Sequence, residues 1–162
     1  MSKKVDPIPA GMEGLIPHLV CEGGAAAIEF YKKAFGAEEV GRMVAPDGKR
    51  LMHAFLRLGT SVIFLADDFP EYCGGVSGSP KALKGTPVTI HRYVVDCDAA
   101  IKQAVDAGAT VVMPAMDMFW GDRYGVIADP FGHKWSIATH IKDMTPEETK
   151  VAMDEAFAQA PN

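Results

Sequence analysis

The chain contains one pattern of expected secondary structure twice, and this repeat limits the fold more than any other feature of the sequence. In the first copy, residues 15–21 are typical of a short apolar strand. Residues 25–37 have apolar side chains at helical spacing, and Gly36 stands where a helix would end. Residues 40–67 then predict three strands, joined by tight turns at Asp47-Gly48 and Gly59-Thr60.

The same order begins again at Val88. A strand is predicted over residues 88–96, a helix over residues 98–109, and three more strands up to residue 139. His18 and His91 occupy the same place in the two first strands, and Ala27-Ile28 aligns with Ala100-Ile101. Two units indicate a pseudo-twofold domain, because a solenoid generally needs three or more repeats.

Length and composition favour one α+β domain, because the chain has 162 residues and 48% of them are hydrophobic. We expect a single domain over residues 1–162, with a first module at about 12–68 and a second at about 88–141. A connection rich in Gly, Ser and Pro, residues 69–87, separates the modules. A C-terminal helix is predicted at about 145–160, since Thr145, Pro146 and Glu148 suit its first turn.

Several classes of partner and site are not indicated. No apolar run is long enough to cross a membrane, and the first 14 residues lack the apolar stretch of a signal peptide, so we expect a cytoplasmic protein without a membrane partner. The net charge is −5 and the basic residues are scattered, which argues against nucleic acid. The three cysteines form no CxxC pair, and no phosphate-binding loop is present.

Three separated segments resemble one known family. They are AAIEFYKKAFGAE, MHAFLRLGTSVIFLAD and FWGDRYGVIADPFGHKWSIATH, within about residues 15–140. With the repeat, they resemble the vicinal oxygen chelate superfamily of glyoxalases, bleomycin-resistance proteins and extradiol dioxygenases, and within it the PhnB-like (3-demethylubiquinone-9 3-methyltransferase-like) branch. The resemblance implies two βαβββ modules that form a barrel-like sheet around a shared cavity, in a homodimer. Methyl transfer is not predicted, because the chain lacks a glycine-rich turn for an adenosine cofactor.

The resemblance also places four metal-ligand positions on His18, Phe64, His91 and Ser136. Phenylalanine offers no donor and serine only a weak one, so we expect no tight metal site. Strand alternation from the Gly59-Thr60 turn, however, places His53 on the same face as Phe64. The open alternative is a divalent metal (zinc, nickel, manganese or iron) held by His18, His53 and His91, which are also the candidate catalytic residues.

Aromatic and cationic residues suit a ligand that is aromatic or anionic. Trp120 and Arg123 precede a predicted strand, and Arg57 shares the predicted face of His53. Trp135 is expected in the core. The complete set of candidate ligand-binding residues is His18, His53, Arg57, Phe64, His91, Trp120, Arg123 and Ser136.

Three functions remain open from the sequence. One is a metal-free protein that binds a small organic ligand, as bleomycin-resistance proteins do. Another is a metal-dependent lyase, isomerase or related enzyme of the glyoxalase type that uses His18, His53 and His91. The third is a structural or interaction module. Whether the protein is an enzyme is not decided by its sequence.

Overall fold

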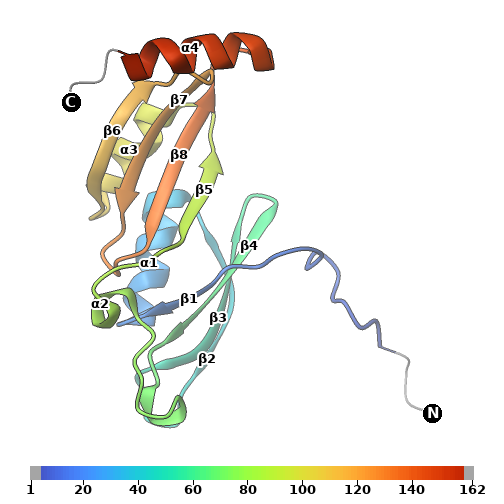
Figure 1. Cartoon of the computed structure of the whole chain (residues 1–162). Helices are drawn as coiled ribbons and strands as arrows, with labels where there is room; N and C mark the ends of the chain where they lie inside the picture. Colours follow the sequence, from blue (N-terminus) through green and yellow to red (C-terminus); the bar gives the residue numbers. More distant parts are fainter. Residues whose placement is uncertain (1–4, 159–162) are drawn as a thin grey trace.

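The computed structural model describes residues 5–158, in which the repeat folds into two modules of one helix and four strands each (Figure 1). The first module contains β1 (His18–Cys21), α1 (Gly24–Phe35), β2 (Glu38–Val44), β3 (Leu51–Leu58) and β4 (Ser61–Asp67). The second contains β5 (Thr89–Tyr93), α3 (Cys97–Asp106), β6 (Thr110–Asp117), β7 (Asp122–Ala128) and β8 (Lys134–His140). The connection carries two short helical segments, η1 (Pro70–Tyr72) and α2 (Pro80–Leu83), and α4 (Pro146–Ala158) follows the second module.

The two sheets have the same topology. Their strand orders are β1-β4-β3-β2 and β5-β8-β7-β6, and in each the first strand of the module runs parallel to its fourth. His18 pairs with Phe64 and His91 pairs with Ser136, so equivalent positions of the repeat meet in both modules. The α+β architecture of two βαβββ modules with a C-terminal helix is therefore confirmed.

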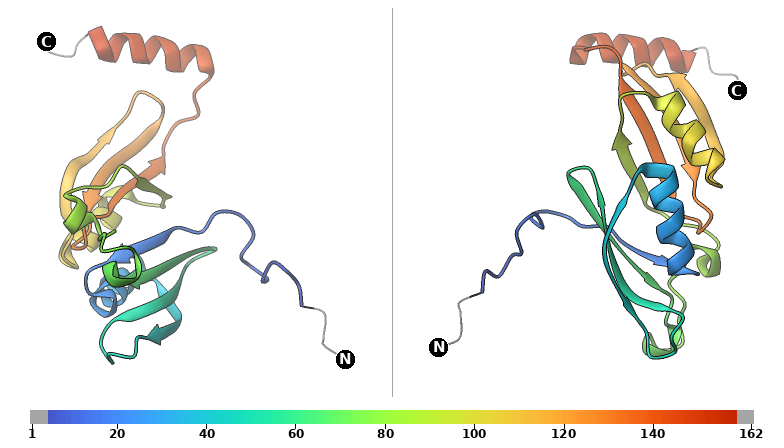
Figure 2. Two further views of the ribbon diagram at one scale, coloured as in Figure 1. Left: turned by 60° about the horizontal axis from the view of Figure 1, so that its bottom comes forward. Right: turned by 180° about the vertical axis from the view of Figure 1, so that it is seen from behind.

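The sheets do not close into a barrel in the described part of the chain. Within residues 5–158 no strand pair joins the two sheets, and each remains a separate four-stranded sheet. The modules are held together instead by α1 and α3, which pack against each other along one side of the molecule (Figure 2). One face of each sheet is thus covered by helices.

The core where the modules meet is aromatic. Trp135 of β8 is 1% exposed, and its ring centroid lies 4.6 Å from that of Phe35 and 5.7 Å from that of Tyr31, both on α1. Asp129, in the turn before β8, accepts hydrogen bonds from the Tyr31 hydroxyl at 2.7 Å and from Trp135 Nε1 at 3.0 Å. The prediction that Trp135 belongs to the core is confirmed.

Helix ends follow local rules that are visible in the sequence. Gly36 ends α1 in the left-handed conformation, with φ 65°, as its position predicted. At the start of α1, Asp67 accepts hydrogen bonds from the backbone N–H groups of Gly23 and Gly24. A Cβ atom at Gly24 would lie 2.8 Å from Asp67 Oδ2, so the close approach requires glycine.

The C-terminal helix begins as expected. The Thr145 hydroxyl accepts a hydrogen bond from Glu148 N, and Glu148 in turn accepts one from Thr145 N, which makes the predicted capping box. The end of the predicted helix, residues 159–160, lies outside the described residues. Across residues 5–158, every helix is too short or too polar to span a membrane.

Candidate functional site

The candidate residues lie mainly on the faces of the two sheets that the helices leave uncovered, which we call the open faces. On β3, the side chains of Ala54, Leu56 and Leu58 are buried under the helices. His53, Phe55 and Arg57 alternate with them and point to the other side. Pairing of Phe55 with Phe64 and of Arg57 with Val62 confirms the predicted hairpin register.

On the first sheet, two histidines and two phenylalanines form one cluster, the His-Phe face (His18, His53, Phe55 and Phe64). The ring centroids of His18 and His53 are 5.7 Å apart. Phe64 lies 4.7 Å from His53 and 6.0 Å from His18, measured between ring centroids, and Phe55 lies 5.6 Å from Phe64. All four rings retain solvent exposure, so together they offer an aromatic surface to a ligand.

The His-Phe face disfavours positive charge on His18. Partial burial lowers the pKa of His18, and the neighbouring His53 lowers it further because two imidazolium ions repel each other. His18 is therefore neutral at pH 7, with a ring nitrogen available to accept a hydrogen bond.

This environment predicts how His18 titrates. In an NMR titration of the imidazole C–H signals, the pKa of His18 is expected below its ordinary value of 6.5. In His53→Gln, the pKa of His18 should rise but stay below its ordinary value, because this variant removes the repulsion and keeps the partial burial. The matched control is His140→Gln, a histidine of the other module, which should leave the titration of His18 unchanged. A His18 pKa at or above its ordinary value would contradict the arrangement.

On the second sheet, His91 lies in an aromatic and polar cluster. His91 Nδ1 and Ser136 Oγ are hydrogen-bonded at 2.7 Å. The His91 ring stacks on Tyr124 at 6.1 Å and meets the Tyr93 ring edge-on at 4.7 Å, again between centroids. We call His91, Tyr93, Tyr124 and Ser136 the His91 face.

A buried carboxylate orders the end of the His91 face. Asp122 accepts hydrogen bonds from the Tyr93 hydroxyl at 2.9 Å, Trp120 Nε1 at 3.1 Å and His140 Nδ1 at 2.8 Å. Burial alone would raise the pKa of Asp122, but these three donors hold it below its ordinary value. The indole N–H of Trp120 is thereby used within the protein, and the Trp120 ring contributes an apolar wall next to Tyr124.

Of the two arginines selected from the sequence, Arg57 shares the first open face and Arg123 lies on the opposite side of its sheet. Arg123 follows Asp122 on β7 and points to the other side of the sheet, where it pairs with Asp98 and Asp117. Arg57 lies on the first open face with its side chain half exposed, and its guanidinium is 4.0 Å from Glu38. Both charges already have carboxylate partners.

The residues of one chain do not fit a metal ion. Between residues 5 and 158, no three His, Cys, Asp or Glu side chains are grouped so that they could hold one. His18 and His53 are neighbours, but His91 lies on the other sheet because β5 pairs with β8 and not with β1. Phe64 brings a hydrocarbon ring to the two histidines where a ligand would be needed, and Ser136 is engaged with His91.

Sequence reasoning missed Asp122 and Tyr93, and it did not distinguish Tyr124 from Arg123. Strand alternation was the available signal. Asp122 and Tyr124 are two residues apart and therefore share a face, while Arg123 between them takes the opposite one. Of the partners that converge on Asp122, Trp120 is two residues away, whereas Tyr93 and His140 lie on other strands and no local pattern reveals them.

Comparisons with known proteins show the family and the fold of this chain. The sequence profile of the Glyoxalase/Bleomycin resistance protein/Dioxygenase superfamily matches residues 16–137. An uncharacterized protein of Mycobacterium bovis is 52% identical over 139 residues, which cover 86% of this chain and 91% of that protein. The X-ray structure of an Arabidopsis thaliana gene product is 30% identical, with a TM-score of 0.62, over 77% of this chain and 97% of that chain. A PhnB protein from Bacillus cereus, 16% identical, shares the fold with a TM-score of 0.58 over 78% of this chain and 99% of that chain.

Proposed function

Because this chain belongs to the Glyoxalase/Bleomycin resistance protein/Dioxygenase superfamily, we propose that it binds a small organic ligand, aromatic or anionic, without a metal ion. The observation that carries the proposal is the His-Phe face. Phe64, in a position where the resemblance expects a metal ligand, presents a ring to solvent beside His18 and His53. A surface of four adjacent rings suits an aromatic body, and imidazole nitrogens suit a hydroxyl or carbonyl group on it.

A homodimer is part of the proposal. The four rings of the His-Phe face retain solvent exposure, and a second copy placed over them would exclude water from the ligand. Apolar side chains at the edge of the first sheet support such a contact, since Met43 is 62% exposed and Val44 is 50% exposed. A cytoplasmic location and the absence of nucleic-acid and membrane partners stay predictions from the sequence.

The second candidate function is the glyoxalase-type metalloenzyme. The His18–His53 pair supports it, because the lowered pKa keeps His18 in the neutral form that binds metals. It would require a third ligand, and His91 would have to come from another copy because it lies on the other sheet. Membership in the PhnB-like branch likewise stays a prediction.

The test of the main proposal uses 2-naphthol, an aromatic probe that is neutral at pH 7. In NMR titrations we expect saturable binding that shifts the ring signals of His18, His53 and Phe64. Phe64→Ala should weaken binding about tenfold, because it removes one stacking partner. Phe157→Ala is the matched control, since it removes a ring that is 70% exposed on α4.

The oligomeric state and the metal content of the purified protein decide between the two candidate functions. Protein purified without chelator is expected to sediment as a dimer and to carry no stoichiometric metal by plasma mass spectrometry. Near-stoichiometric zinc, nickel, manganese or iron that is lost in His18→Ala, His53→Ala and His91→Ala would overturn the metal-free proposal. Equal affinity of Phe64→Ala and Phe157→Ala for 2-naphthol would remove the His-Phe face as the ligand site.

A further inference from the structure

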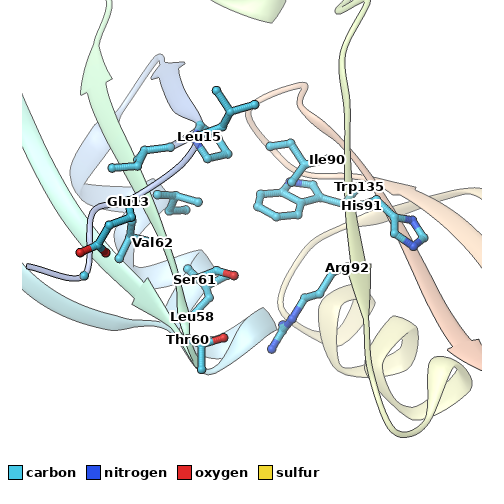
Figure 3. A pocket seen from close by; sticks show the side chains of 14 residues that line it. Glu13, Leu15, Leu58, Thr60, Ser61, Val62, Ile90, His91, Arg92 and Trp135 are labelled. Carbon is cyan, nitrogen blue, oxygen red and sulfur yellow. The ribbon is translucent and has the colours of Figure 1, made fainter.

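A cavity of about 330 Å³ lies between the two modules, and it includes His91 but no residue of the His-Phe face (Figure 3). Its walls come from Trp135 of β8 and from three further segments that are distant in sequence. These are the N-terminal segment with Glu13 and Leu15, the tip of the β3–β4 hairpin with Thr60 and Ser61, and β5. The volume is at the lower end of the range of small-molecule sites, so a ligand of few atoms would fit.

Arg92 of β5 enters this cavity, whereas the imidazole of the neighbouring His91 points away from it (Figure 3). The Arg92 side chain is partly buried, and its guanidinium lies 5.7 Å from the centroid of the Phe35 ring. Nη1 donates a hydrogen bond to the Phe35 carbonyl oxygen at 3.3 Å. A guanidinium has five N–H donors, so most of its hydrogen-bonding capacity remains for a ligand.

Arg92 differs from the other arginines in having no carboxylate partner among residues 5–158. Each of the other four is paired: Arg42 with Glu39, Arg50 with Asp47 and Glu71, Arg57 with Glu38, and Arg123 with Asp98 and Asp117. Burial lowers the pKa of Arg92, but a guanidinium stays charged in proteins. A partly buried cation without a counter-charge is unfavourable by itself and becomes favourable when an anion binds.

The remaining walls indicate which anion fits. The hydroxyl groups of Thr60 and Ser61 lie across the cavity from Arg92 (Figure 3). The apolar part of the cavity wall is formed by Leu58, Ile90 and Trp135. Glu13 brings a carboxylate to the wall beside Val62 on the far side, and this disfavours a ligand with a second negative charge (Figure 3).

We propose that this intermodule cavity binds a monoanionic organic acid, whose carboxylate pairs with Arg92 and whose apolar body lies against Leu58 and Ile90. The planar fork of the guanidinium matches both oxygens of a carboxylate. The site is separate from the His-Phe face, so it holds whether or not that face binds an aromatic ligand.

The test compares two probes of the same shape, phenylacetate and its neutral counterpart phenylacetamide, by NMR titration of the backbone amides. Phenylacetate is expected to shift the amides of Thr60, Ser61 and Arg92 and to bind at least about tenfold more tightly than phenylacetamide, since a charged hydrogen bond is lost with the amide. Arg92→Gln should remove this preference. Lys102→Gln, which deletes an equal charge on the exposed side of α3, should retain it.

Four results would contradict the proposal. One is equal affinity for phenylacetate and phenylacetamide. Another is unchanged phenylacetate binding by an Arg92→Gln variant whose unfolding temperature equals that of the wild type and which is therefore folded. The third is the absence of shifts at Thr60, Ser61 and Arg92 at millimolar phenylacetate. Inorganic phosphate, which carries charge without an apolar body, should bind more weakly than phenylacetate. Equal binding of phosphate would show a general anion site and contradict the assignment to an organic acid.

Discussion

Replacing Asp129 by alanine is expected to lower the free energy of unfolding by about 3 to 5 kcal/mol, because one buried carboxylate serves four donors. Asp129 is 5% exposed. It accepts hydrogen bonds from the Tyr31 hydroxyl at 2.7 Å and Trp135 Nε1 at 3.0 Å, and from the backbone N–H groups of Phe131 and His133, both at 2.9 Å. Alanine would leave these donors without a partner in the core between the modules. Urea unfolding followed by tryptophan fluorescence measures the change.

Two further variants separate the hydrogen bonds from the charge. Asp129→Asn keeps the size and one acceptor oxygen, so its loss of stability should be clearly smaller than that of alanine. Asp106→Ala removes an exposed carboxylate that pairs with Lys102 on the same helix, and it should change stability little. If Asp129→Ala were as stable as Asp106→Ala, the hydrogen bond between Tyr31 and Asp129 would not contribute to holding the two modules together.

The elements that could be predicted from the sequence are those fixed by neighbours along the chain. The two-residue turn at Gly59-Thr60 sets which residues of β3 and β4 face each other, and Arg57 does pair with Val62. Gly36 ends α1 because it adopts a left-handed conformation that other residues avoid. The short helices of the connection, such as Pro80–Leu83, were not predicted, since four residues are too few to show a helical period.

The relation between the modules could not be predicted in the same way. It depends on contacts such as Phe35 with Trp135, which join side chains that are far apart in sequence and that the repeat does not duplicate. The resemblance implied one cavity, so His18, His53 and His91 were expected together, whereas the structure divides them between two sheets. Arg92 was overlooked for a related reason. Only the tertiary structure shows that, among the arginines of the described chain, Arg92 alone has no carboxylate partner.

The variant Phe64→Glu is expected to bind zinc about 100-fold or more tightly than the wild-type protein, because it adds a third donor to a face that already holds two. Phe64 lies next to both His18 and His53, and its side chain is only partly buried, so a carboxylate can remain solvated there without zinc. Competition with a chromophoric chelator measures the affinity. His18→Ala in the Phe64→Glu background should abolish the gain.

The control for added charge is Val62→Glu. Val62 lies two residues before Phe64 on the same face of β4, and its partner on β3 is Arg57. This variant adds the same carboxylate farther from His18 and should leave zinc affinity near that of the wild type. A large gain in Phe64→Glu alone would mean that His18 and His53 already present their nitrogens correctly, and that one hydrocarbon ring keeps metal from this face. Equal affinities in the two variants would mean that the imidazole nitrogens point away from each other. His18 and His53 would then contact a ligand through the surfaces of their rings, as the exposed phenylalanines beside them do in the proposed site.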